Sequence, residues 1–471
     1  MKQAHFTKFI FIAFPIIIFL INPASTHDLA IWIKLGQNTL NNFSLTTNEN
    51  ISFLQTSEEI YPSWALNIIY AFLYNLGDFN LIFFINRCVV FFIFLKIIKE
   101  TKDYFVDNLS TFKLSVIFIS LYTLSIGLVD RPSLIGLAVL LCIYLNFTKH
   151  KKLETKSIIK IIALTIIGIN LHASTLSVLI MSSWHFIINL LSKGNKRWQD
   201  LFILPLTMVS LCINPFGVDI FKYAYLTREF SKERMITEWS STLSFTNYIE
   251  ESFLFCLIIL YVIYLIYRQY KIKKLNFDHM IPFLVLGLLS VRHIVISCLF
   301  AIVFIIKQEV PNNNSFTLFA HKSFNKVISI FIVLLIILMV PFWKYHFLFL
   351  LPSNKNRIVS ELYPEKEISY IIDNGIEGNI FNQIEIGGIL SLKQKNKIFM
   401  DARNIIFLEN DFNNYKEILN SKETALEKLD NYNIKIIVVQ SKFLSLINTI
   451  STNSNWRPLN LSDEFFMAIK K

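Results

Sequence analysis

The chain has 471 residues, of which 54% are hydrophobic and 17% are charged, and its mean hydropathy is +0.49. A soluble globular protein has about a quarter of its residues charged, so this composition excludes an ordinary soluble enzyme. The 44 phenylalanines exclude a disordered chain, because such chains are poor in aromatic residues. The composition therefore indicates a polytopic membrane protein with a soluble appendage.

The net charge of +11 is confined to the hydrophobic part of the chain. From Pro352 to the end, 15 basic residues balance 15 acidic ones, which leaves 30 basic and 19 acidic residues in the first 351. A basic excess in the loops of a hydrophobic region is typical of cytoplasmic loops between membrane spans. We therefore expect no nucleic-acid partner.

The first apolar run covers residues 9–24 and follows a short basic start. It lacks a clean small-x-small cleavage site, so we expect an uncleaved first helix rather than a signal peptide. With the later runs, the sequence predicts about eleven membrane-spanning helices. Residues 62–76 predict an additional interfacial helix. The later apolar runs lie near residues 79–98, 113–129, 132–148, 157–170, 173–191, 199–213, 249–267, 279–291, 294–306 and 326–349.

Basic residues gather in alternate loops, around positions 96–102, 149–156, 193–197, 268–274 and 322–326. These loops should be cytoplasmic. An odd number of spans then places the C-terminal part on the outer side. We expect a multi-pass protein of the bacterial plasma (inner) membrane, with an extracytoplasmic C-terminal domain in the cell envelope.

The chain divides into a helical transmembrane domain over residues 1–351, with a first outer loop at 26–63, and a soluble domain over residues 352–471. In the soluble domain, strand-like runs alternate with helical patterns, which predicts a small α/β domain. The expected strands are 379–381, 397–400, 435–439 and 465–469, and the expected helices are 365–374, 411–430 and 442–450. No glycine-rich phosphate loop occurs, and the five cysteines lie in apolar runs without metal or redox spacing.

Polar residues recur at the predicted outward ends of the spans. Ionisable residues at membrane depth are costly and need a partner or a function. Their gathering on one side predicts a polar cleft that opens outward. The set comprises His27, Asp28, Asp130, Arg131, Asn170, His172, Asn214, Glu238, Trp239, Arg292 and His293.

Each of these residues also has a structural interpretation. Asp28 fits a helix cap, Arg131-Pro132 fits a turn in which Asp130 or a lipid phosphate holds the arginine, and Asn214-Pro215-Phe216-Gly217 is a turn signature. His172 and His293 fit ordinary interfacial histidines. Glu238 and Arg234 have the i, i+4 spacing of a helical ion pair.

The order of these short motifs resembles a large prokaryotic family of polytopic membrane proteins that is grouped with the GT-C glycosyltransferases. The resemblance runs nearly the full length of the chain. It rests on Asp28-Leu29-Ala30-Ile31-Trp32, Arg131-Pro132-Ser133-Leu134, Asn170-Leu171-His172, Asn214-Pro215-Phe216-Gly217, Glu238-Trp239, Arg292-His293, Tyr363-Pro364, Gly387-Gly388 and Met400-Asp401-Ala402-Arg403.

The resemblance implies transfer of a hexosyl or pentosyl group from a polyprenyl-phosphate donor to a glycan, lipid or protein acceptor on the outer face. Asp28 matches the position of the general base. Arg131, Arg292 and His293 are candidate phosphate-binding groups, because arginine binds phosphate through paired hydrogen bonds. His172 and Glu238 would complete the acceptor side or hold a divalent metal such as Mg or Mn. Asn170 and Asn214 join the expected substrate-binding set, and membrane lipids are expected partners.

One stretch departs from the family pattern. Relatives carry a second acidic residue where this chain reads Pro62-Ser63-Trp64, and Glu58 and Glu59 lie just upstream as substitutes or as a solvated pair. Two other functions therefore stay open, a non-catalytic scaffold of a cell-envelope assembly and a lipid or solute transporter. Asp401 and Arg403 are expected to form a surface ion pair or to recognise an acceptor.

Overall fold

The computed structural model describes residues 27–45, 51–54, 62–101, 104, 111–126, 128, 131–149, 153–191, 198–234, 236–244, 248–271, 278–308, 363–403, 406–420 and 424–471. The expected spans 9–24 and 326–349 lie outside these residues, as do Glu58, Glu59 and Asp130. The chain forms two compact units. The first contains residues 1–23 and 83–354, and the second contains residues 24–82 and 355–471.

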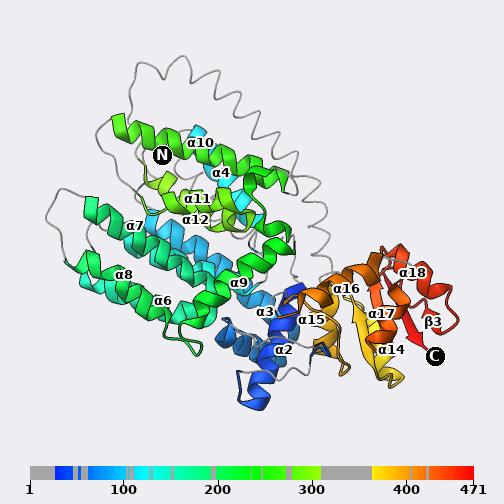
Figure 1. Ribbon diagram of the computed structural model, residues 1–471. Coiled ribbons are helices and arrows are strands. Elements are labelled where there is room, and N and C mark those ends of the chain that lie inside the picture. The colour runs from blue at the N-terminus through cyan, green and yellow to red at the C-terminus, as the bar shows by residue number, and fades with distance from the viewer. Residues whose placement is uncertain are drawn as a thin grey trace. The chain divides into compact units, whose positions relative to one another are not determined.

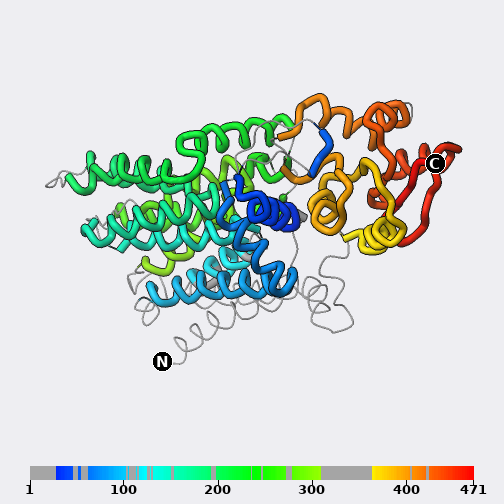
Figure 2. The backbone as a smooth tube through the Cα atoms, turned by 90° about the horizontal axis from the view of Figure 1, so that it is seen from below, coloured from blue at the N-terminus to red at the C-terminus, as the bar shows by residue number. Residues whose placement is uncertain are grey.

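The first unit is built from helices, which run side by side (Figures 1 and 2). Helices α4, α10, α11 and α12 contact one another, and helices α5, α6, α7 and α8 form a second contacting set. Their bounds are α4 Thr111–Ile126, α5 Pro132–Lys149, α6 Thr155–Leu171, α7 Val178–Leu191, α8 Trp198–Leu211, α9 Asp219–Glu233, α10 Ile249–Lys271, α11 Ile281–Leu289 and α12 Ile294–Lys307, with short 3-10 turns η2 Ala173–Ser177, η3 Thr237–Trp239, η4 Thr242–Ser244 and η5 Val291–His293.

Four described helical segments are long and apolar enough to cross a membrane: Trp64–Thr101, Pro132–Lys149, Ala173–Leu191 and Ile249–Lys271. A shorter apolar helix covers Trp198–Leu211. The described part of the chain is thus mainly helical, as expected, and includes helices that are long and apolar enough to span a membrane. The expected count of about eleven spans is not confirmed, because other expected spans fall on shorter helices, such as the 9-residue α11, or outside the described residues.

A buried lysine ties two helices of the first unit together. Lys113 lies on α4 and is fully buried, and its Nζ donates to the carbonyl oxygens of Ile306 at 2.9 Å and Gln308 at 2.6 Å. These carbonyls belong to the C-terminal end of α12, where a cation offsets the helix dipole and satisfies carbonyls that lack helical partners. The lysine therefore fixes the end of α12, whose residues Ile296–Ile306 are all buried.

The second unit combines a C-terminal mixed sheet with helices from both ends of the chain. Strands β1 Asn379–Asn382, β2 Ile434–Gln440, β3 Trp456–Leu459 and β4 Phe465–Lys470 lie in the order β1-β2-β4-β3. β1 pairs with β2 in parallel, and the other pairs are antiparallel. The helices are α2 His27–Asn42, the first part of α3 Trp64–Thr101, α14 Glu365–Asp373, α15 Ile384–Lys393, α16 Glu409–Asn420, α17 Ala425–Asn431 and α18 Leu444–Ser451.

The expected small α/β domain is present, with several differences in detail. Residues 397–400 form only isolated bridges, which pair Ile398 with Ser52 and with Ile380. The pattern 411–430 is interrupted between α16 and α17, and both β3 and α15 are additional to the expected elements. The segment 62–76 is helical as expected, and α3 changes direction after it, at Gly77 and Asp78, where Asp78 has a φ of 56°.

The N-terminal part of the second unit is integrated into its core. Ser52 Oγ donates to the carbonyl oxygen of Phe399 at 2.8 Å, and the amide of Ile398 donates to the carbonyl of Ile51 at 3.0 Å. Leu54 joins the C-terminal hydrophobic core, and α2 packs against α15 (Figure 1). The sequence segment expected as an outer loop is therefore a structural part of the C-terminal unit.

Asp401 and Arg403 are a buried pair, and the expectation of a surface ion pair was wrong. Arg403 Nη2 lies 2.6 Å from Asp401 Oδ2 and Arg403 Nε lies 2.8 Å from Asp401 Oδ1, and both side chains have 0% exposure. Gly387 on α15 approaches this loop so closely that a Cβ would overlap the carbonyl oxygen of Met400. The Gly387-Gly388 and Met400–Arg403 motifs thus serve packing.

Candidate functional site

Three short elements of the first unit bring the outward polar residues together. Arg131 directly precedes α5, Glu238 lies in η3, and Arg292 lies in η5. Ser290 Oγ donates to the carbonyl oxygen of Glu238 at 3.1 Å, and the amide of Val291 donates to the carbonyl of Ser240 at 3.1 Å. These bonds fix η3 against η5.

Glu238 lies between two guanidinium groups. Arg131 Nη1 donates to Glu238 Oε1 at 2.8 Å, and Arg292 Nη1 lies 3.6 Å from Glu238 Oε2. The side chains of Arg131 and Glu238 are 23% and 29% exposed, whereas Arg292 is 42% exposed. Two cations share one anion, so this trio carries a net charge of +1, and Arg292 is its most exposed member.

Aromatic rings hold the accessible arginine in place. The guanidinium carbon of Arg292 lies 5.2 Å from the ring centroid of Trp239, a cation–π geometry. The Trp239 and His293 rings meet edge to face, with centroids 6.0 Å apart. Both residues of Glu238-Trp239 therefore contact Arg292, and Trp239 also contacts His293. These contacts restrain the direction in which the Arg292 side chain points.

His172 is a neutral, buried histidine at the junction of α6 and η2. Its Nδ1 accepts a hydrogen bond from the amide of Ser174 at 3.0 Å, so the ring proton is on Nε2, which is the donor. Burial, and then the charge of Arg292, lower the pKa of His172 to about 3. At neutral pH this ring can donate a hydrogen bond from Nε2 but carries no charge.

His293 is neutral for the same reasons. Burial, and then the charges of Arg292 and Arg228, lower its pKa to about 4. Its Nδ1 is buried without a hydrogen-bond partner in the described part of the chain. Among the described residues, this leaves one ring nitrogen of His293 buried and unsatisfied.

Asn170 and Asn214 hold the chain near the end of α8. Asn170 Nδ2 donates to the carbonyls of Ile166 at 2.8 Å and Ile213 at 2.9 Å. Asn214 Oδ1 accepts from the amide of Phe216 at 2.8 Å, and Gly217 completes the turn with a φ of 55°. Both asparagines thus have structural roles, and for Asn214 the role is the one that the turn signature indicates.

Asp28 belongs to the second unit, where it lies in the first turn of α2. A carboxylate there interacts favourably with the helix N-terminus. The helix is buried on more than one side, at residues that include Leu29, Ile31 and Ile33. Its close packing brings Gly36 against the carbonyl of Asn67 on α3, with no room for a Cβ.

The described residues do not fit a resident metal ion. No group of three His, Cys, Asp or Glu side chains converges among them in a way that could hold one. Glu238, an expected candidate, has its carboxylate oxygens next to Arg131 and Arg292. We derive no step through a metal.

Two members of the site were not singled out from the sequence. Arg228, on α9, acts electrostatically on His293, and Ser290 anchors η3. Arg228 has no outward-end motif around it, and Ser290 is an ordinary polar residue. The contact between η3 and η5 identifies Ser290, and the electrostatic effect on His293 identifies Arg228.

No family model and no curated protein matches the sequence. Among solved structures, the chain is similar to the archaeal oligosaccharyltransferase AglB from Archaeoglobus fulgidus, in complex with an inhibitory peptide and a dolichol-phosphate. The identity is 10% and the TM-score is 0.49, with 99% of this chain and 75% of that chain covered.

Proposed function

We propose that this chain is a membrane glycosyltransferase that moves a sugar from a polyprenyl-phosphate donor to an acceptor on the outer face. The observation that carries the proposal is the trio of Arg131, Glu238 and Arg292. Its excess positive charge and its accessible guanidinium suit a phosphate, which arginine binds through paired hydrogen bonds.

The proposed reaction needs a base on the acceptor and a cation on the leaving group. The carboxylate of Asp28 takes the proton of the acceptor hydroxyl, and the hydroxyl oxygen attacks the anomeric carbon. The bond between that carbon and the phosphate oxygen breaks, and the lipid phosphate leaves with the bonding electrons. Arg131 and Arg292 stabilise the charge that develops on this phosphate.

The remaining residues have supporting roles in the proposal. Glu238 positions the two guanidiniums, because its oxygens face Arg131 and Arg292. His172 donates from Nε2 without adding charge, since its Nδ1 is occupied by Ser174. His293 contacts Trp239 edge to face, and Trp239 in turn contacts the guanidinium of Arg292, so His293 helps to position this arginine.

Binding of a polyprenyl phosphate to the purified full-length protein tests the proposal. We expect saturable binding to wild type and at least about tenfold weaker binding to the double variant Arg131→Ala, Arg292→Ala, because hydrogen bonds to charged groups contribute about 1.5–3 kcal/mol each. The matched control is Arg457→Ala, which removes the guanidinium of an exposed residue of β3. This variant should bind the polyprenyl phosphate as wild type does. Equal binding to wild type and the double variant would overturn the phosphate site.

A second variant separates binding from chemistry. Asp28→Asn should retain donor binding and lose transfer, because the amide cannot accept the hydroxyl proton. The measurement is release of sugar from a polyprenyl-phosphate donor pool, with expression and folding checked in parallel. Full transfer by Asp28→Asn would overturn the role of the base, and normal donor binding would leave the phosphate site standing.

A further inference from the structure

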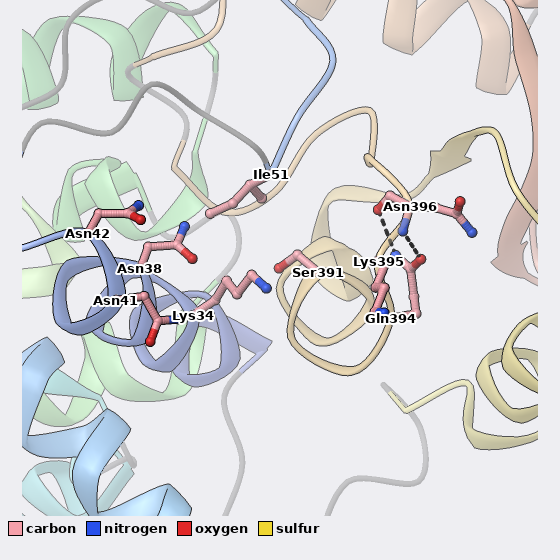
Figure 3. Close-up of a pocket in the computed structure, with 9 residues that line it drawn as sticks. All are labelled: Lys34, Asn38, Asn41, Asn42, Ile51, Ser391, Gln394, Lys395 and Asn396. Atoms are coloured by element: carbon pink, nitrogen blue, oxygen red, sulfur yellow. Dashed lines mark hydrogen bonds between the residues drawn. The ribbon is translucent and has the colours of Figure 1, made fainter.

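A polar pocket of about 300 Å³ lies within the second unit, and none of the residues assigned to transfer lines it. One wall is the face of α2 that carries Lys34, Asn38, Asn41 and Asn42, at the spacing of one helical face. The opposite wall is the end of α15 and the turn that follows it (Figure 3). The pocket is at the lower end of the size range of small-molecule sites.

The turn at the far wall is fixed by its own amides. Gln394 Nε2 donates to the carbonyl of Asn396 at 2.8 Å, and Gln394 Oε1 accepts from the Asn396 amide at 2.5 Å. The side chain of Asn396 accepts from the amide of Gly378 at 3.1 Å and donates to the carbonyl of Ile376 at 2.8 Å. These two side chains are occupied, so they shape the pocket rather than bind in it.

The α2 wall is different, because its polar groups are uncommitted. Among the described residues, Lys34, Asn38, Asn41 and Asn42 form no side-chain hydrogen bond or ion pair with one another or with the far wall. In Figure 3 the Lys34 side chain extends toward Ser391 across the pocket. Amide and hydroxyl groups that both donate and accept can match a ligand rich in hydroxyls.

The charge of the lining selects for an anion. Among the described residues that line the pocket, Lys34 and Lys395 are the charged ones, and none is an aspartate or glutamate. Lys34 is half-buried, and this burial lowers its pKa. A partly desolvated ammonium gains from an anionic partner. Ile51 is the apolar residue of the lining, and no aromatic ring is present for a base or a neutral sugar to stack on.

We propose that this pocket binds an anionic sugar, with Lys34 and Lys395 holding the carboxylate or phosphate and the asparagines of α2 holding the hydroxyls. The geometry requires no transfer chemistry, so the site is independent of the proposed glycosyltransferase activity.

The test is calorimetric binding to the full-length protein in nanodiscs, with trigalacturonate and glucose 6-phosphate as probes. We expect saturable binding of at least one probe. Binding of trigalacturonate identifies a carboxylate as the anion, and binding of glucose 6-phosphate identifies a phosphate. A neutral galactose trisaccharide should bind at least about tenfold more weakly, since it lacks the charge-assisted bond.

Variants connect the binding to the pocket. Lys34→Met and Asn38→Leu should each weaken binding of the probe by about tenfold or more. Lys395→Met should also weaken binding, and because Lys395 lies on an exposed turn, this change removes a charge with little loss of packing. Lys397→Met, two residues further along and outside the lining, is the matched control. No binding of either probe, unchanged binding to both lysine variants, or inorganic phosphate binding as tightly as glucose 6-phosphate would overturn the proposal.

Discussion

The side chains of Asp401 and Arg403 are both fully buried and make two hydrogen bonds to each other. Removing one partner of such a pair leaves an uncompensated buried charge, which costs about 3–5 kcal/mol. We expect Asp401→Asn and Arg403→Met each to lower the thermal unfolding midpoint of the purified chain strongly. The double variant should recover part of the loss. Single variants as stable as wild type would contradict a closed buried pair.

The neutral histidines of the site make stability depend on pH. The pKa of His172 is about 3 in the folded chain and that of His293 about 4, against an ordinary value of 6.5. Between these values and pH 6.5, both histidines are protonated in the unfolded chain but neutral in the folded chain. Their contribution to the free energy of unfolding is therefore complete above pH 6.5 and is lost as the pH falls toward the folded-state pKa values.

This loss assigns a measurable effect to His172. Below pH 6.5, the His172 side chain lowers the free energy of unfolding by about 1.4 kcal/mol per pH unit, or by about 2 kcal/mol at pH 5. His172→Asn keeps an acceptor for the Ser174 amide but does not titrate. Its unfolding midpoint should fall less steeply between pH 7 and pH 5 than that of wild type. Parallel slopes for the two proteins would contradict the lowered pKa.

The sequence predicts which residues gather at the outward ends, but not how they pair. Charge alternation and apolar runs are local patterns, and they indicate the side on which Arg131, Glu238 and Arg292 lie. The bond between Arg131 and Glu238 joins residues 107 positions apart, which no local pattern encodes. Asp401 and Arg403 were expected at the surface because charged side chains are seldom fully buried, and their mutual pairing is the exception.

Among the elements, α5 and η2 meet at a glycine that sets the position of His172. A Cβ on Gly136 would overlap Ser174 Oγ and come within 3.2 Å of His172 Cβ and Nδ1. We expect Gly136→Ala to displace η2, lowering both stability and any transfer that uses His172. The measurement compares unfolding midpoint and donor turnover with wild type.

A second change supplies the control for this prediction. Ser174 Oγ is buried without a hydrogen-bond partner among the described residues, so Ser174→Ala alone should cost little. In the double variant Gly136→Ala, Ser174→Ala the main overlap is removed, and part of the loss should be recovered. A double variant no better than Gly136→Ala would show that the close approach is not the cause.

The elements that the sequence missed are those whose formation depends on neighbours. β3 has only one buried residue, Trp456, and is paired along one side with β4, so its own hydrophobic pattern is weak. α15 contains Gly387 and Gly388, which disfavour helices by roughly 1 kcal/mol each, yet its burial against α2 and the Met400 loop outweighs that cost. Tertiary packing overrides local propensity in both cases.

At the scale of the whole chain, the second unit is discontinuous in sequence. The amide of Ile398 is paired with Ile51, and Leu54 fills the C-terminal core. We expect residues 363–471 expressed alone to be less stable than the same residues fused to residues 27–82. Hydrogen exchange at the Ile398 amide is the sharpest measurement, because its bond requires the N-terminal segment. Equal protection in both proteins would contradict the integration.

The same discontinuity constrains how the membrane helices can be arranged. Residues 27–82 and 363–471 form one folded unit, so they lie on one side of the membrane, and the chain between them must cross an even number of times. Topology reporters at residue 45 and at residue 471 should therefore give the same side. Any relative of this protein that keeps the unit can gain or lose membrane helices between its two halves only in pairs.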